Sequence, residues 1–267
     1  MTTPEIEKRF FSVRQLPLIA IIMYVFALGA WIAVLGRWVP MPGGEMEGMN
    51  MEMSEPGVPE AMAIGQGLVG VGLYLVMWGV MMIAMMYPST VPLFRLYNQT
   101  LRELSFSGKA ARLSALLGVY TLVWTLTGLV PLIVNTMAPI TVLASDYRFL
   151  LFGGVLILLG GYQLSPYKYQ CLDKCRSPFG FLMTYHRPGI RGAARIGVRF
   201  SVFCVGCCWA LFAFMIVVGS MNILWMAIIA LVLSLERTVS WGPQLARAVG
   251  VVAGVTGVGL LVVSVVS

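Results

Sequence analysis

The sequence has 267 residues, of which 59 % are hydrophobic and 11 % are charged. Soluble chains carry about 45–50 % apolar and about 25 % charged residues, so this chain has too few charges to cover a soluble surface. The composition excludes an ordinary cytosolic enzyme, a disordered chain and a secreted disulfide scaffold. It predicts one all-α domain over residues 1–267: a polytopic transmembrane helix bundle in the cell membrane, with the lipid bilayer as a partner.

Seven stretches meet or approach the roughly 20 apolar residues that a membrane-spanning helix needs. They are 17–36, 66–87, 113–135, 148–165, 197–219, 221–236 and 247–266. The sixth is short, which leaves a tilted or half-buried helix open there. The first has a longer apolar run than a secretory signal peptide, so we expect a retained helix. Ala246, Gly250 and Gly254 give the last stretch a small-residue stripe, typical of close helix packing.

Charge sets the expected orientation. A net charge of +7 suits the excess of Lys and Arg that membrane proteins keep on the cytoplasmic side, and it does not require nucleic acid as a partner. With a cytoplasmic N-terminus, seven spans place sixteen of eighteen basic residues inside and only Arg37 and Arg148 outside. Loop 37–63 then lies outside and a basic loop, 166–196, lies inside. The single histidine, His186, falls in that basic loop, where we expect it to be solvated.

The predicted outer loop is rich in methionine. Its methionines are Met41, Met46, Met49, Met51 and Met53, with five glutamates in the same loop. Methionine in a polar loop has no core to fill, and thioether is a soft ligand that selects Cu(I) over hard cations. It also survives an oxidising exterior, where free thiols pair. The pattern predicts copper capture; the alternative is a disordered loop of biased composition.

The same topology places all five cysteines towards the cytoplasm. Cys204, Cys207 and Cys208 share one arc of a helix, since successive residues turn by about 100°. Cys171 and Cys175 share a face if their segment is helical. Disulfides are disfavoured in the cytoplasm. We therefore predict a soft-metal thiolate site, with Cu(I) favoured over zinc by the methionines; for any one cysteine, packing as a small hydrophobe is the alternative.

A route between the two clusters can be drawn through buried methionines. Met77, Met81 and Met85 form one stripe, and Met215 lies two turns beyond Cys208. Methionine packs equally well in any helix bundle, so the relay competes with simple packing. Glu236 is ionisable at depth, and we expect it to pair with an arginine or to carry function. We see no nucleophile–base pair or paired carboxylates and expect no catalytic residues.

Four blocks of the sequence resemble a known family. They are Trp78 to Pro88 with Ala84-Met85-Met86; Gly161-Tyr162-Gln163-Leu164 to Cys175-Arg176-Ser177-Pro178; Cys204-Val205-Gly206-Cys207-Cys208-Trp209; and Met221-Asn222 to Glu236. Together they resemble the "predicted metal-binding integral membrane protein" family of bacteria and archaea, which has no established activity. The resemblance implies a polytopic helical protein with cysteine ligands. Phe200 departs from it, because many members have histidine at that position.

The leading hypothesis is a membrane protein that handles copper(I): capture at the outer loop, then transport, delivery or sensing through the inner thiols. A copper chaperone or a larger membrane complex would be its partner. Two alternatives stay open: a quinone-linked thiol oxidoreductase, which the lack of outer cysteines disfavours, and a non-catalytic accessory subunit.

A single thiolate site also makes a geometric prediction. Sulfurs of the two cysteine groups should lie within about 8 Å, given metal–sulfur bonds near 2.3 Å. Cys204 and Cys208 should face protein rather than lipid, and Met81 or Met85 should face the thiols.

Overall fold

The computed structural model describes residues 18–39 and 54–266, and within these ranges all regular structure is helical. The helices are α2 (Leu18–Leu35), α3 (Val58–Gly65), α4 (Gly67–Thr100), α5 (Phe106–Leu126), α6 (Leu129–Met137), α7 (Ile140–Asp146), α8 (Arg148–Leu164), α9 (Pro166–Arg176), α10 (Pro178–Tyr185), α11 (Gly189–Gly219), α12 (Ile223–Thr238) and α13 (Gly242–Val266). The predicted all-α fold is therefore confirmed.

Five helical segments are long and apolar enough to cross a membrane: α2, α4, α5 continued by α6, α11 and α13. A sixth would be α7 with α8, although these two helices meet at a bend of 111°. Helix α12 has 16 residues, fewer than the roughly 20 of a straight crossing. The structure thus supports five or six candidate spans rather than the seven predicted, and the cytoplasmic N-terminus stays a prediction.

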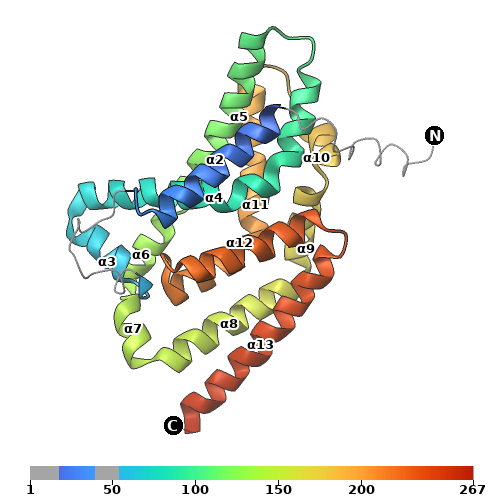
Figure 1. The fold of residues 1–267 in the computed structure, drawn as a ribbon. Helices are drawn as coiled ribbons and strands as arrows, with labels where there is room; N and C mark the ends of the chain where they lie inside the picture. The colour runs from blue at the N-terminus through green and yellow to red at the C-terminus, as the bar shows by residue number, and fades with distance from the viewer. Residues whose placement is uncertain (1–17, 40–53, 267) are drawn as a thin grey trace.

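Helix α11 is the centre of the bundle. In its most apolar window 67 % of residues are buried, against 17 % for α13. Helices α5, α8, α9 and α12 all pack against it (Figure 1). Aromatic rings fill one side, where Phe212 of α11 lies 5.3 Å from Trp124 and 6.5 Å from Trp78 between ring centroids. A side chain on the inner faces of α11 is therefore shielded by protein on several sides.

Helix α4 continues through two prolines, Pro88 and Pro92. Because Pro88 has no N–H, the carbonyl of Ala84 loses its helical donor. The indole Nε1 of Trp31 in α2 donates to that carbonyl at 3.1 Å. This bond satisfies the freed backbone oxygen and joins α2 to α4.

Helices α8 and α13 run side by side (Figure 1) and meet through glycines. A Cβ at Gly160 would lie 2.7 Å from the backbone nitrogen of Gly254 and 2.8 Å from the carbonyl oxygen of Gly250. A Cβ at Gly257 would be 2.8 Å from the carbonyl of Gly153. The close packing expected from the small-residue stripe is confirmed.

The loop predicted over 166–196 is mostly helical. Ser165 caps α9, its Oγ accepting from the backbone N–H of Lys168 at 3.4 Å, and Pro166 occupies the first turn. Both are typical start signals of a helix. Helix α10 and the beginning of α11 fill the remainder. This local folding places Cys171 and Cys175 on a short helix that packs against α11.

Candidate metal centre

The three cysteines of α11 face into the protein. Cys204, Cys207 and Cys208 are each at most 1 % exposed, so none points to lipid, as predicted. The sulfurs of Cys207 and Cys208 lie 3.1 and 2.9 Å from the carbonyl oxygen of Cys204. Their spacing along the helix gathers the thiols around one turn.

Helix α9 brings the second cysteine group to them. The sulfur of Cys175 lies 3.9 Å from the sulfur of Cys207, well within the separation predicted for one site. Cys171 lies against Gly206, where an added Cβ would be 3.0 Å from its sulfur, so this glycine allows the close approach of α9 to α11. Burial, with the nearby Cys207, raises the pKa of the Cys171 thiol.

Arginine at the end of α12 completes the centre, and sequence reasoning missed it. Nη2 of Arg237 lies 3.3 Å from the sulfur of Cys207 and 3.7 Å from that of Cys208, and it donates to the carbonyl of Cys204 at 3.3 Å. The side chain is only 6 % exposed, and among the described residues its Nε has no hydrogen-bond partner. In the described part of the chain Arg237 has no carboxylate within ion-pairing distance. Since a buried cation is costly without an anion, thiolate sulfur is its nearest candidate counter-charge.

The other guanidinium nitrogen reaches α4. Nη1 of Arg237 donates to Ser89 Oγ at 3.0 Å and lies 3.8 Å from the sulfur of Met86. Arg237 therefore stands between a methionine of α4 and the thiols of α11. The predicted relay placed Met81 or Met85 next to the thiols; the α4 methionine whose sulfur contacts Arg237 is Met86.

Glu236, next to Arg237, has a lysine partner instead of the predicted arginine. Lys168 Nζ lies 2.7 Å from Glu236 Oε2, and both side chains are 1 % exposed. Gln163 donates to the other carboxylate oxygen at 3.1 Å and accepts from Lys168. Arg176, also on α9, donates to the carbonyl of Glu236. This network fixes α9, and with it Cys175, against α8 and α12.

Tyrosine and phenylalanine close the side of the centre towards α5 and α10. The hydroxyl of Tyr120 lies 3.2 Å from the sulfur of Cys204. Phe200, in place of the histidine that the family resemblance suggests, packs between Tyr120 and Phe181 at ring distances of 5.9 and 5.3 Å. His186 is exposed at the end of α10, as expected of a solvated residue.

The predicted methionine positions divide into two groups. Met77, Met81, Met85 and Met215 are all buried in the core, which suits both packing and a relay, so the relay stays a prediction. The outer loop methionines Met41, Met46, Met49, Met51 and Met53 lie outside the described residues.

In the described residues, no three His, Cys, Asp or Glu side chains already converge in an arrangement that could hold a metal ion. Two sulfurs do. With metal–sulfur bonds of about 2.3 Å, two ligands of one ion lie at most about 4.6 Å apart, and the sulfurs of Cys175 and Cys207 are 3.9 Å apart. Cu(I) accepts low coordination numbers, and soft thiolates select it.

These features define an all-α protein with a buried, cysteine-rich centre beside a guanidinium. A family model described as "PpoB2: Copper chaperone" matches residues 75–260, more than half of the chain. The chain belongs to this family, and its function is copper-related. The matched range contains all five cysteines and Arg237 but not the outer methionine loop.

No curated protein and no solved structure matches the chain. The resemblance drawn from the sequence agrees with the family match in its broad sense, a metal-binding family of membrane type. The particular family that the resemblance named is not confirmed.

Proposed function

We propose that this chain is a membrane-embedded protein that binds Cu(I) through Cys175 and Cys207 and passes it on. The observation that carries the proposal is the 3.9 Å approach of these two sulfurs from separate helices, with Arg237 beside them. Both sulfurs are buried in protein, where a soft cation is shielded from water and oxidants.

The charges of the site support a two-thiolate complex. Cu(I) with two thiolates carries one negative charge, and the guanidinium of Arg237 carries one positive charge. The pair is then neutral in a low-dielectric interior, which avoids the cost of an uncompensated buried charge. Structural zinc takes four ligands, whereas two sulfurs converge here, so the site favours Cu(I), which accepts fewer.

The outer loop would supply the copper. Met41, Met46, Met49, Met51 and Met53 would capture it, and buried thioethers would hand it inward, ending at Met86 on the other side of Arg237. Delivery of Cu(I) to a soluble chaperone or a larger membrane complex is the step we infer next. Because Arg237 separates the last thioether from the thiols, its side chain would turn aside as copper passes.

Competition with a chromogenic Cu(I) chelator tests this function on the full-length protein in detergent under reducing conditions. Wild type should retain Cu(I) at a chelator concentration that removes Cu(I) from a Cys175→Ser/Cys207→Ser double variant. Cys171→Ser is the matched control, since Cys171 is partly exposed and its sulfur lies against a glycine. Equal Cu(I) retention by wild type and the double variant would contradict the proposal.

The second candidate, a quinone-linked thiol oxidoreductase, uses the same sulfur approach. Cys175 and Cys207 would join in a disulfide, releasing two protons and two electrons to a quinone. All five cysteines are free in the structure. A redox titration followed by thiol alkylation and mass spectrometry decides: a reversible Cys175–Cys207 disulfide, without copper binding, would favour the oxidoreductase.

A further inference from the structure

Glu60 of α3 is a buried carboxylate that the thiol centre does not use. Its side chain is 0 % exposed, and its Oε1 accepts a hydrogen bond from the Tyr74 hydroxyl of α4 at 2.7 Å. In the described part of the chain, its Oε2 has no hydrogen-bond partner and no cationic side chain pairs with it. Because a buried carboxylate is costly without a compensating charge, Glu60 requires a partner that these residues do not supply.

The end of α11 presents further oxygen atoms without donors. The last carbonyls of a helix need partners from outside it. Within the described residues, however, no backbone N–H that follows Gly219 donates to the carbonyl oxygen of Val217 or Val218. Both valines are buried, at 6 and 7 % exposed. Ser220, the next residue, is 1 % exposed, and its Oγ likewise has no partner there.

Glu60 and the end of α11 lie close together. Gly219 has a φ of 105°, and a Cβ at this position would collide with the carbonyl oxygen of Ser54. This glycine therefore lets the segment that leads into α3 lie against the end of α11. The Tyr74 hydroxyl, which donates to Glu60, also lies near the side chain of Ser220. Tyr74 thus connects the buried carboxylate to the end of α11.

The unpartnered atoms of this cluster are all oxygens: one from a carboxylate, one from a hydroxyl and two from backbone carbonyls. Oxygen ligands suit hard cations, whereas Cu(I) is selected by sulfur. The single carboxylate balances one positive charge, and the C-terminal end of a helix adds partial negative charge. Carbonyls at interrupted helix ends, together with polar side chains, coordinate Na⁺ in membrane transporters. The cluster therefore has the chemistry of a site for a hard monovalent cation.

We propose that Glu60, Ser220 and the carbonyl oxygens of Val217 and Val218 bind one Na⁺, with Tyr74 holding the carboxylate in place. The ion neutralises Glu60 and ties α3 to the end of α11. A protonated Glu60 is the competing explanation, but a carboxylic acid supplies only one O–H donor, too few for the four unpartnered oxygens. The site is separate from the thiol centre, so the proposal does not rest on copper binding.

Thermal unfolding of copper-free, full-length protein in detergent tests this, with NaCl replacing choline chloride at constant ionic strength. The melting temperature of wild type should rise by about 3–5 °C for each tenfold increase in Na⁺ above its Kd. Glu60→Gln keeps the shape of the side chain and removes its charge, so its melting temperature should not respond to Na⁺.

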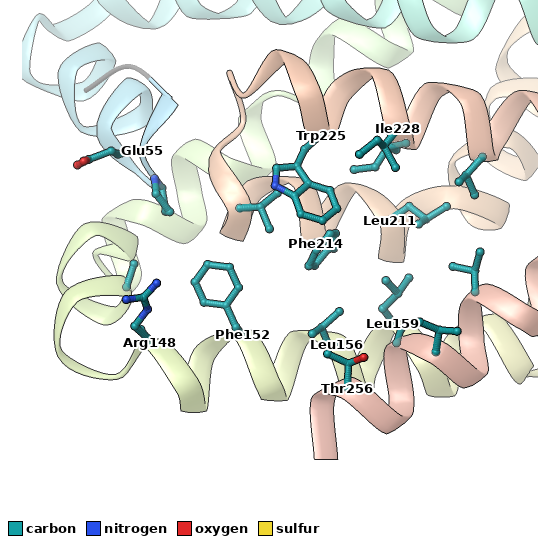
Figure 2. Close-up of a pocket in the computed structure, with 18 of the residues that line it drawn as sticks. Glu55, Arg148, Phe152, Leu156, Leu159, Leu211, Phe214, Trp225, Ile228 and Thr256 are labelled. Atoms are coloured by element: carbon teal, nitrogen blue, oxygen red, sulfur yellow. The ribbon is translucent and has the colours of Figure 1, made fainter. Parts of the chain in front are cut away.

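Glu55→Gln is the matched control and should respond as wild type does. Glu55 belongs to the same segment but is exposed. Figure 2 shows its carboxylate directed away from the apolar cavity of about 920 Å³ between α8, α11, α12 and α13. The control therefore removes the same charge without removing a buried ligand.

Equilibrium dialysis with radioactive Na⁺ gives a second measurement. Wild type and Glu55→Gln should bind one Na⁺ per chain, and Glu60→Gln should bind none. Ser220→Ala, which removes a ligand but no charge, should weaken binding about tenfold, and it decides the matter if circular dichroism shows that Glu60→Gln does not fold.

A melting temperature of wild type that is independent of Na⁺ would overturn the proposal and leave a protonated carboxyl in its place. Equal Na⁺ responses of Glu60→Gln and Glu55→Gln, or wild-type affinity in Ser220→Ala, would also overturn it. Neither measurement uses copper, so a failure of the thiol site leaves both interpretable.

Discussion

The buried ion pair between Lys168 and Glu236 offers the sharpest test of how the thiol centre is held. The perturbation is Lys168→Met, which keeps the length of the side chain and removes its charge. Glu236 then keeps its contact with Gln163 but loses its cation while remaining 1 % exposed. Because Lys168 is on α9, the change should also loosen the helix that carries Cys175.

The magnitude follows from the burial of both partners. Removing one member of a fully buried ion pair costs about 3–5 kcal/mol, since the remaining charge is left uncompensated. Replacing both, as in Lys168→Met/Glu236→Leu, should recover most of that loss, because an apolar pair has no desolvation cost. Lys174→Met on the same helix is the control; Lys174 is exposed and should change stability by no more than about 0.5 kcal/mol.

Two measurements are made on the four proteins in detergent. One is the denaturant concentration at which each protein unfolds, and the other is the rate at which a thiol reagent labels Cys175 in the folded protein. Lys168→Met should unfold at lower denaturant concentration and label faster, and the double variant should lie close to wild type. Stability and labelling of Lys168→Met equal to those of Lys174→Met would refute the reasoning that this ion pair fixes α9.

Three further predictions follow from the same contacts. Arg237→Gln should weaken Cu(I) binding about tenfold by losing a charge-assisted contact, while exposed Arg247→Gln should not change it; equal affinities in a chelator competition would remove Arg237 from the centre. Cu(I) affinity should rise with pH from mildly acidic to mildly alkaline values. The reason is that hydrogen bonds to Cys204 and Cys207, with burial, raise the pKa of the Cys175 thiol, and copper must displace the proton of that thiol. A pH-independent affinity would exclude Cys175 as a ligand. Gly160→Ala should destabilise the protein by about 1–3 kcal/mol through overpacking, whereas Gly161→Ala, with nothing within 4 Å of its Cβ, should be tolerated; equal unfolding midpoints would show that α8 and α13 do not pack as closely as described.

Helical periodicity made the cysteine cluster predictable. The spacing of Cys204, Cys207 and Cys208 sets a common face on any regular helix, and burial of that face follows from the centrality of α11. The one-site hypothesis required Cys175 to approach these thiols. How the chain brings Cys175 there depends on the new helix, α9, that begins at Ser165 and Pro166.

The role of Arg237 could not be read in the same way. An arginine at the end of an apolar run is ordinarily placed at the membrane surface, which is where the sequence pattern put it. Its burial depends on α12 lying against α11 and α4, a contact between segments far apart in the chain. The lysine partner of Glu236 was missed for the same reason, since it comes from a different helix, 68 residues earlier.

The span count differed because apolar length is not the same as a straight helix. Residues 221–236 read as a span, but Asn222 caps α12 by accepting from the N–H of Trp225, and the helix ends at Thr238. The stretch 148–165 corresponds to α8, which passes the length test only together with α7 across the bend. The hydropathy pattern identifies both segments as apolar but does not reveal the bend between α7 and α8.

X-ray absorption at the copper edge of Cu(I)-loaded full-length protein tests the central claim most directly. For the copper that remains after chelator competition, the account predicts a shell of sulfur scatterers alone, which is lost from the Cys175→Ser/Cys207→Ser variant and kept in Cys171→Ser. A shell dominated by nitrogen or oxygen, or an identical sulfur shell in the double variant, would contradict a copper centre built on Cys175 and Cys207.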